Sequence, residues 1–445
     1  MRSGELKTDT IVALATPGGR GAIGIVRLSG PGVPAVAKRL LGRLPVPRVA
    51  TLCRFRDARG EFIDEGIALY YDAPRTYTGE PMLELQGHGG PVVMRGLLAA
   101  CADAGARLAE PGEFTRRAFL NEKLDLAQAE AVADLIDAAS REAARSALRS
   151  LTGEFSEAVE GLVAGLVELR ALVEATLDFP EEELDPLHRE EAAERLHGIL
   201  RSLEEALSRS RRGSLLRAGV RVVIAGRPNV GKSSLLNRLA GEERAIVTPV
   251  AGTTRDALRE LILIDGVPLV VVDTAGLRAT TDAVEQIGVE RARRELAEAD
   301  VVLEVLDATH PDDALADELP AGAVRIVLHN KIDLLPAAQR GALASGVLGV
   351  SAKTGEGLDA LRRRILEAAG WSGGAGEPVF LARERHLRAL EAARTRLRDA
   401  ACAMPRWELF AEELRLAQSA LGEIGGGITS DALLGEIFAR FCIGK

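Results

Sequence analysis

The chain has little cysteine, no long apolar run and no excess of positive charge, and each absence argues against a class of protein. Its 445 residues include four cysteines, widely scattered, with no CxxC pair and no metal-like spacing of histidine and cysteine. This usage is typical of reduced thiols in the cytoplasm. The formal net charge of −9 argues against a generally basic nucleic-acid coat but leaves room for a local basic patch.

No apolar stretch approaches the roughly 18 residues of a membrane-spanning helix, and the first residues lack the apolar core of a signal peptide. The sequence therefore predicts a cytoplasmic protein without a membrane partner. Hydrophobic residues make up 47% of the chain and charged residues 27%, a balance typical of globular proteins. A chain of this length is too long for one compact core, so we expect several domains.

Changes of residue pattern divide the chain into four segments. Residues 1–118 combine short apolar runs with glycine and proline, which predicts a mixed α+β domain with one helix over about 91–104. Residues 119–215 have apolar side chains at helical spacing. Residues 216–372 alternate strand and helix patterns, which is typical of a mostly parallel sheet wrapped by helices. Helical spacing then returns over residues 373–445.

The two helical segments flank the α/β segment. We expect one discontinuous helical domain with the α/β domain inserted into it, because compact domains insert readily where their ends lie close together. Two separate helical domains are the alternative. The hairpin pattern around Asp265-Gly266 is the clearest turn signal inside the α/β segment.

A phosphate-binding loop follows the first expected strand of the α/β domain. The segment from Gly226 to Ser233 has the GxxxxGKS spacing and stands between a strand and a helix. Glycines let backbone N–H groups converge on phosphate oxygens, Lys232 reaches the β and γ phosphates, and the Ser233 hydroxyl is a Mg²⁺ ligand. A plain glycine-rich turn is the alternative reading.

Three further motifs, which begin at Asp273, Asn330 and Ser351, follow in the order that a GTPase requires, and a threonine pair precedes them. Thr254 is expected to complete the Mg²⁺ shell, and Asp273 ends a strand from which its carboxylate can meet Mg²⁺ through water. Asn330-Lys331-Ile-Asp333 supplies a carboxylate that pairs with the N1–H and 2-amino group of guanine, and Ser351-Ala352-Lys353 offers backbone contacts to the base. The predicted fold class is therefore multidomain α/β with an inserted Ras-like P-loop G domain.

The chain also resembles the MnmE/TrmE family of tRNA-modification GTPases, within the TrmE-Era-EngA-like superfamily. Three segments carry the resemblance, which extends over essentially the whole chain: 252–256 (GTTRD), 285–290 (EQIGVE) and 441–445 (FCIGK). The residues that motifs and resemblance together assign to the nucleotide are Asn229, Val230, Gly231, Lys232, Ser233, Ser234, Thr248, Thr253, Thr254, Asp273, Thr274, Ala275, Gly276, Asn330, Lys331, Asp333, Ser351, Ala352 and Lys353.

The water-orienting glutamine of Ras-like proteins is replaced here by Leu277, which has no hydrogen-bonding group. The resemblance implies a substitute: a K⁺ ion and G-domain dimerisation, with Glu285 orienting the water and Lys232 and Thr254 completing the catalytic set. The implied metal ligands are Ser233 and Thr254 for Mg²⁺ and Asn229, Thr248, Val250 and Thr253 for K⁺. From the residues alone, Asn229 could simply stabilise its loop, and Glu285 could be an ordinary carboxylate at a helix start.

In the N-terminal segment, Arg27 and Glu84 lie on apolar strands, where an unpaired charge would be costly. An internal ion pair or outward-facing side chains are simple readings. The resemblance implies instead a folate-binding domain that takes a 5-formyl-tetrahydrofolate-type cofactor. Its contacts would be Arg27, Glu84, Lys123 and Lys445. Cys442 is a weak candidate for a reactive thiol, against the reading of a packed small side chain.

The resemblance further implies a homodimer that works with an MnmG-like protein, dependent on FAD and NADH, in a heterotetramer. Together they would add an aminomethyl or carboxymethylaminomethyl group to C5 of the wobble uridine of certain tRNAs. One alternative is an Era- or Der-like ribosome-assembly switch without modification activity. Another is a folate-dependent transferase with the G domain as regulator only.

Overall fold

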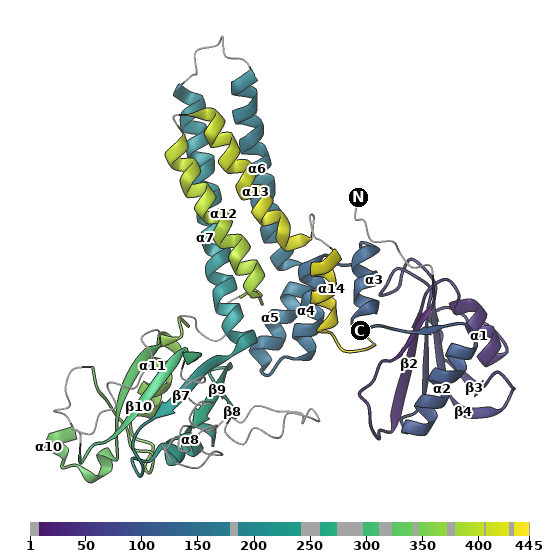
Figure 1. Ribbon diagram of the computed structural model, residues 1–445, viewed down its shortest axis with the longest axis horizontal. Coiled ribbons are helices and arrows are strands. Elements are labelled where there is room, and N and C mark those ends of the chain that lie inside the picture. The colour runs from purple at the N-terminus through teal and green to yellow at the C-terminus, as the bar shows by residue number, and fades with distance from the viewer. Residues whose placement is uncertain are drawn as a thin grey trace, which may run out of the picture. The chain divides into compact units, whose positions relative to one another are not determined.

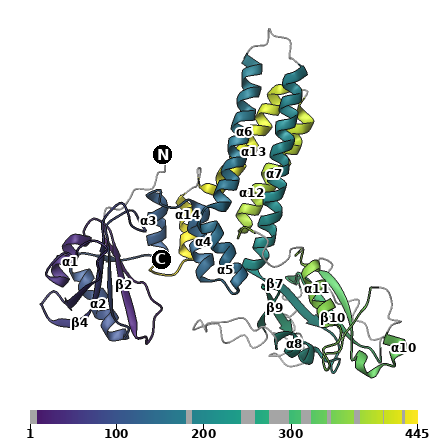
Figure 2. The ribbon, with the colours of Figure 1, turned by 180° about the vertical axis from the view of Figure 1, so that it is seen from behind.

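The structure is a computed structural model, and it describes residues 9–178, 186–241, 259–273, 297–310, 323–340, 346–371, 379–404, 406–426 and 431–444. Ribbon views from the two sides show an N-terminal sheet, a set of long helices and a second sheet (Figures 1 and 2). None of the described helices has the length and apolar character needed to cross a membrane.

The N-terminal sheet has the strand order β3-β4-β5-β2-β1-β6, antiparallel except for the β1–β6 pair. Its strands are β1 (Ile11–Leu14), β2 (Ile23–Ser29), β3 (Thr51–Arg56), β4 (Phe62–Tyr71), β5 (Met82–His88) and β6 (Arg107–Leu108). The associated helices are α1 (Val33–Leu41), α2 (Pro91–Asp103) and α3 (Glu113–Leu120). The helix expected over about 91–104 is confirmed as α2, whereas β3, α1 and α3 were not predicted.

The alternation of β2 explains how its sheet is covered. Val26 and Leu28 are fully buried in one core with Leu97 of α2. Because successive side chains of a strand point to opposite faces, Arg27 lies on the other face of the sheet. One side of β2 therefore builds the core, and the other side can carry a polar site.

The helical segments on both sides of the α/β region pack together. The helices are α4 (Leu126–Ile136), α5 (Arg141–Leu151), α6 (Glu154–Asp178), α7 (Pro186–Ala218), α12 (Glu384–Ala403), α13 (Trp407–Gly425) and α14 (Asp431–Ala439). Helix α13 packs along α6, and Arg170 Nη1 donates to Gln418 Oε1 at 2.6 Å. The expectation of one discontinuous helical domain is confirmed by this packing.

The second sheet has the order β12-β11-β10-β7-β9-β8, parallel except for the β8–β9 hairpin. Its elements are β7 (Val220–Ala225), α8 (Lys232–Ala240), β8 (Arg259–Ile264), β9 (Val267–Asp273), β10 (Val301–Asp307), β11 (Val324–Asn330), a 3-10 helix (Ile332–Leu334), α10 (Ala337–Arg340), β12 (Leu348–Gly349) and α11 (Leu358–Ala368). Asp265 and Gly266 both have positive φ, +49° and +79°, which confirms the predicted hairpin turn.

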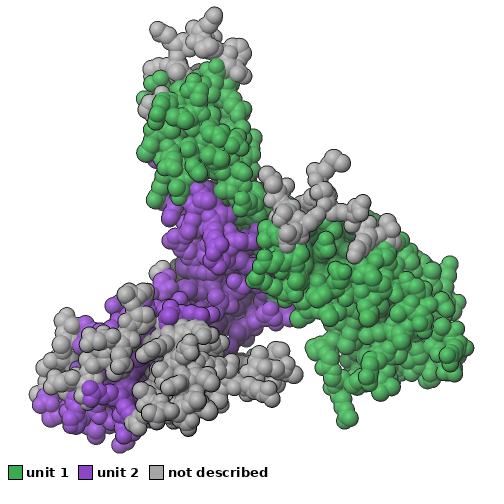
Figure 3. Space-filling view, viewed as in Figure 1, with its two compact units in different colours: residues 1–133, 151–196, 395–445 green, residues 134–150, 197–394 purple. Residues whose placement is uncertain are grey.

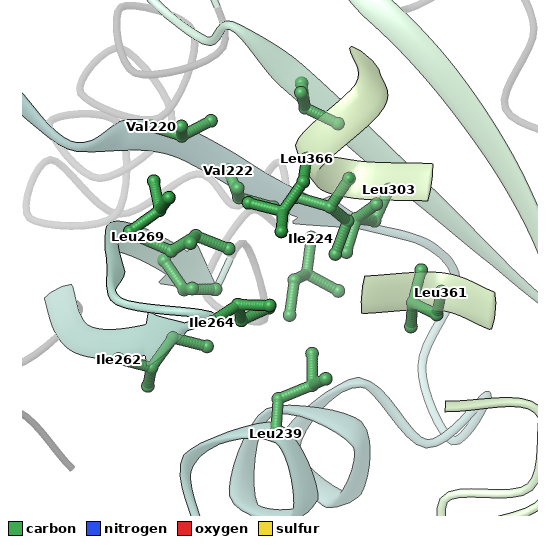
Figure 4. Close-up of a cluster of buried hydrophobic side chains, with 14 of the residues drawn as sticks. Val220, Val222, Ile224, Leu239, Ile262, Ile264, Leu269, Leu303, Leu361 and Leu366 are labelled. Atoms are coloured by element: carbon green, nitrogen blue, oxygen red, sulfur yellow. The ribbon is translucent and has the colours of Figure 1, made fainter. Parts of the chain in front are cut away.

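Apolar side chains of β7 form the centre of this sheet's core. Val222 and Ile224 share one core with Leu239 of α8 and Leu361 of α11 (Figure 4). The central parallel strands are buried on both faces, which explains their nearly continuous apolar runs. This core holds the carboxyl ends of the parallel strands at one edge, where the loops with the sequence motifs begin.

The chain splits into two compact units (Figure 3). Unit 1 comprises residues 1–133, 151–196 and 395–445, and unit 2 comprises 134–150 and 197–394. Unit 2 joins α5 and the end of α7 to the second sheet, because Ala147 and Leu216 share a core with Ile262 of β8.

Candidate functional site

The loop from Gly226 to Lys232 connects β7 to α8 in a conformation that only particular residues adopt easily. Gly226 has φ +155°, Asn229 φ +63° and Gly231 φ +98°. A Cβ atom on Gly226 would collide with the carbonyl oxygen of Val305, and one on Gly231 with Nδ2 of Asn330. The two glycines are therefore required both for the backbone angles and for the close packing of the loop.

Lys232 begins α8 and is 8% exposed. Its Nζ donates to the carbonyl oxygens of Gly226 at 2.7 Å and Arg227 at 2.9 Å, so the ammonium lies within the curve of the loop. Ser233 and Ser234 follow in the exposed first turn of the helix. Backbone N–H groups and the helix dipole at this end favour a phosphate.

Asn330, the last residue of β11, joins two loops. Its side chain is 2% exposed; Nδ2 donates to the carbonyl of Val230 at 2.8 Å, and Oδ1 accepts from the backbone N–H of Ala352 at 3.0 Å. The phosphate loop and the Ser351–Lys353 segment are thus fixed to each other through one buried amide.

Asp333 lies in the 3-10 helix that follows β11, and its carboxylate is oriented by a neighbour. Oδ1 accepts from the Ser351 hydroxyl at 2.7 Å, and the same Ser351 oxygen accepts from the N–H of Thr354 at 3.1 Å. Ser351 is fully buried, whereas Lys353 is exposed. One oxygen of the Asp333 carboxylate is thus held by Ser351, beside the segment that Asn330 joins to the phosphate loop.

Lys331 has φ +69°, and its Nζ donates to the carbonyl of Asn229 and to Oδ2 of Asp307, both at 2.7 Å. Burial opposes ionisation of Asp307, but hydrogen bonds from Lys331 and Thr309 outweigh it and lower the pKa of Asp307 to about 2. Asp307 was not among the residues predicted from the sequence.

The exposed Ser233 and the backbone position of Asp273 fit the Mg²⁺ expectation. Asp273 ends β9 and pairs in register with Ile224 of β7, so it lies at the same sheet edge as the phosphate loop that leads to Ser233. A serine hydroxyl and a carboxylate are oxygen donors of the kind that Mg²⁺ prefers. Among the implied K⁺ ligands, the structure describes Asn229, whose side chain is exposed.

Several predicted site residues lie outside the described part of the chain. They are Thr248, Val250, Thr253, Thr254, Thr274, Ala275, Gly276, Leu277, Glu285 and Lys445. Their assignments stay predictions.

The predicted folate contacts Arg27 and Glu84 face each other across β2 and β5. Nε and Nη2 of Arg27 lie 2.9 and 2.8 Å from Oε1 of Glu84, and the two side chains are 21% and 13% exposed. The simple reading of an ion pair is thus what the structure shows. Lys123 is exposed just after α3.

Cys442 is exposed, and its backbone carbonyl accepts from the N–H of Gly112 at 3.4 Å. The reading of a packed small side chain at Cys442 is therefore wrong. The neighbouring Phe441 is buried in a cluster with Phe119 and Phe438, which anchors this end of the described chain.

A cavity of about 550 Å³ opens on the N-terminal domain between the loop over residues 16–21 and the start of α2. Gly24 and Met94 line it, so it lies on the helix-covered face of the sheet. Arg27 and Glu84 are on the other face and are not among its lining residues. The cavity and the predicted folate contacts are therefore separate features.

Comparison with known proteins decides the family. Residues 126–442 match the family model of the MnmE helical domain, and residues 10–123 match that of the GTP-binding protein TrmE N-terminus. The chain belongs to the MnmE family. The tRNA modification GTPase MnmE of Azoarcus sp. is 61% identical over 98% of both chains. The protein of the same name from Thiobacillus denitrificans is 58% identical over 99% of this chain and 98% of its own.

A solved structure of Era from Aquifex aeolicus covers 40% of this chain and 66% of its own, at 29% identity and a TM-score of 0.28. A score this low supports no conclusion about the fold. The match to the MnmE family, by contrast, extends through both flanking regions, so the interpretation as an Era- or Der-like switch is not favoured.

Proposed function

We propose that this chain hydrolyses GTP and uses the turnover in the modification of tRNA. One observation carries the proposal: Asn330 and Asp333 are held in one hydrogen-bonded unit with the phosphate loop and Ser351. Such a unit selects guanine, because adenine cannot donate two hydrogen bonds to the Asp333 carboxylate. The names of the full-length relatives support the tRNA part of the proposal.

In this mechanism, Lys232 and the N–H groups at the start of α8 bind the phosphates and stabilise the charge that develops on them. Ser233 and Thr254 would hold Mg²⁺, which supplies charge neutralisation, with Asp273 meeting the ion through water. Glu285 would orient the attacking water, the role that Leu277 cannot fill. The phosphate loop and the base-recognition loop fix the nucleotide at both ends.

K⁺ would be held by Asn229 together with Thr248, Val250 and Thr253, and would act with G-domain dimerisation. The exposed side chain of Asn229, in a left-handed backbone conformation at the loop, supports this assignment. We expect faster GTP hydrolysis in K⁺ than in Na⁺ at equal ionic strength. Asn229→Ala should remove the difference between the two salts. Equal rates for the unmodified protein would contradict the K⁺ assignment.

The product we propose is a carboxymethylaminomethyl or aminomethyl group at C5 of the wobble uridine. It would be made by a homodimer of this chain together with an MnmG-like flavoprotein. Arg27, Glu84, Lys123 and Lys445 would bind the 5-formyl-tetrahydrofolate-type cofactor that carries the one-carbon unit, and the exposed Cys442 remains a candidate thiol near this tail. We also propose the domain ranges 1–118, 119–215, 216–372 and 373–445.

Mass analysis of wobble uridines in cells that lack the protein tests the reaction. We expect C5 to be unmodified in these cells. Expression of the unaltered chain should restore the modification, whereas expression of the Asp333→Asn variant should not. Normal tRNA accompanied by defective ribosomal subunits would instead overturn the proposal in favour of an assembly switch.

A further inference from the structure

The ammonium of Lys331 joins three segments that are far apart in the sequence. Lys331 follows β11, Asn229 belongs to the phosphate loop, and Asp307 ends β10; the two hydrogen bonds from Nζ are both 2.7 Å. The side chain runs from the loop that carries Asp333 to the loop that binds phosphate. A nucleotide bound to both loops would run the same way, from its base to its phosphates.

Asp307 is itself fixed in orientation. Its Oδ1 accepts from the backbone N–H of Thr309 at 3.0 Å and from the Thr309 hydroxyl at 2.7 Å. Asp307 also pairs in register with Asn330, and the N–H of Ala308 donates to the Asn330 carbonyl at 2.8 Å. Because Oδ1 is held by Thr309, Oδ2 stays directed at the ammonium of Lys331, and the carboxylate is preorganised to hold it.

We propose that Asp307 is a positioning residue for guanine-nucleotide binding. It fixes the ammonium of Lys331, so that the apolar stem of this lysine forms one wall of the base site beside Asp333. A lysine stem is flexible and can pack against apolar surface, so holding its charged end fixes where the stem lies. The carbonyl of Asn229 alone would leave the ammonium a single, uncharged acceptor.

The sign of the effect distinguishes positioning from simple electrostatics. A carboxylate near a polyphosphate repels it, so removing the charge of Asp307 would strengthen nucleotide binding if repulsion were its main effect. Positioning of Lys331 predicts the opposite, a weaker complex. It also predicts no change in the preference among bases, because the stem of Lys331 does not read the 2-amino group.

The test is Asp307→Asn in the full-length chain, with the affinities and dissociation rates of GDP and IDP as readouts. We expect both affinities to fall by about 5- to 20-fold, mainly through faster dissociation, with an unchanged ratio of GDP to IDP. Asp300→Asn is the matched control: Asp300 is exposed just before β10, where it accepts from the N–H of Arg221 at 2.8 Å. It should leave both affinities unchanged.

A double-mutant cycle with Lys331→Met tests the route of the effect. In the Lys331→Met background, Asp307→Asn should cause no further loss. Unchanged or tighter GDP binding in Asp307→Asn, or an equal loss in both backgrounds, would overturn the inference. If Asp307→Asn does not fold, Thr309→Ala keeps the carboxylate but removes the hydroxyl, one of its two anchors at residue 309. It should weaken GDP binding about 2- to 5-fold, and no change would equally overturn the inference.

The inference depends on the two loops being the nucleotide site. If that assignment fails, either the unaltered protein does not bind GDP, or it binds GDP but Asp333→Asn leaves the ratio of GDP to IDP affinity unchanged. If only the role of Asp307 fails, the unaltered protein binds GDP and Asp333→Asn still changes that ratio. The two failures are therefore distinguishable.

Discussion

Lys331, just after β11 of the second sheet, and Arg117 in the N-terminal domain are both cations that bind carboxylates, but their surroundings differ. Lys331 is 31% exposed, lies at the carboxyl end of a parallel strand and holds two acceptors. Arg117 is 5% exposed and donates to Asp9, Glu80 and Glu113. The first cation leaves a side-chain stem at a sheet edge where a ligand can bind, whereas the second is enclosed by its partners.

The enclosed network joins pieces of the N-terminal domain that no local pattern would connect. Arg107 adds hydrogen bonds to Asp9 at 2.6 Å and to both carboxylate oxygens of Glu113 at 2.6 and 2.9 Å. Three carboxylates and two guanidinium groups thus tie β6, α3 and the segments before β1 and β5 together. This comparison indicates that charge alone does not identify a ligand site. The charged group must also lie beside surface that a ligand can reach.

The largest effect is expected for Arg117→Met. It leaves Asp9, Glu80 and Glu113 with one guanidinium fewer in a buried place, and breaking such a group costs about 3–5 kcal/mol. Hydrogen exchange of the α3 amides measures this loss as a lower free energy of local opening. The control is Arg54→Met, because Arg54 and Glu65 pair at 2.8 Å with side chains 67% and 45% exposed; we expect about 0–1 kcal/mol there. Equal effects would contradict the contrast between enclosed and exposed pairs.

Acid should weaken the same network, by a smaller amount. Hydrogen bonds from Arg107 and Arg117 outweigh burial and lower the pKa of Asp9 from 3.8 to about 2. A carboxylate with a depressed pKa contributes stability that is full above its unfolded pKa and is lost as the pH falls through its folded pKa. Protection of the α3 amides should therefore decline between about pH 4 and pH 2. Asp9→Asn should lower protection at neutral pH and flatten the decline, while an unchanged slope would exclude Asp9 as its source.

Local patterns were sufficient to predict the second sheet and its motifs. The strand before Gly226, the Asp265-Gly266 turn and the order of the motifs each depend on a few neighbouring residues. Helix α1 was missed although its buried residues Val33, Val36, Ala37 and Leu40 have helical spacing, because its nine residues are fewer than the window over which that spacing is diagnostic.

Contacts between distant segments escaped prediction for a different reason. Arg117 and Asp9 lie 108 residues apart, and Lys331 and Asp307 lie 24 apart. Their pairing depends on which strands become neighbours. The position of Asp307 at the carboxyl end of a parallel strand was the available signal, because ligands bind at that edge of such sheets.

The smallest effect on stability is expected at Arg27 and Glu84, an ion pair that is intermediate between the exposed and the enclosed kind. The pair is partly exposed and lies on the face of its sheet opposite α2. Replacing both residues, by Arg27→Met with Glu84→Leu, should cost about 1 kcal/mol or less, because no unpaired charge remains. Either single replacement should cost more than the double one. Hydrogen exchange of the β2 amides measures these changes.

The same variants test whether this pair is a ligand site or only an ion pair. If Arg27 and Glu84 bind the folate cofactor, the double variant keeps its fold but loses 5-formyl-tetrahydrofolate binding in calorimetry. The double replacement Arg54→Met with Glu65→Leu, in the same sheet, should leave that binding unchanged. Full binding by the Arg27/Glu84 double variant would show that the pair, like Arg117, only stabilises the fold. The cavity on the opposite face would then be the remaining candidate for the cofactor site.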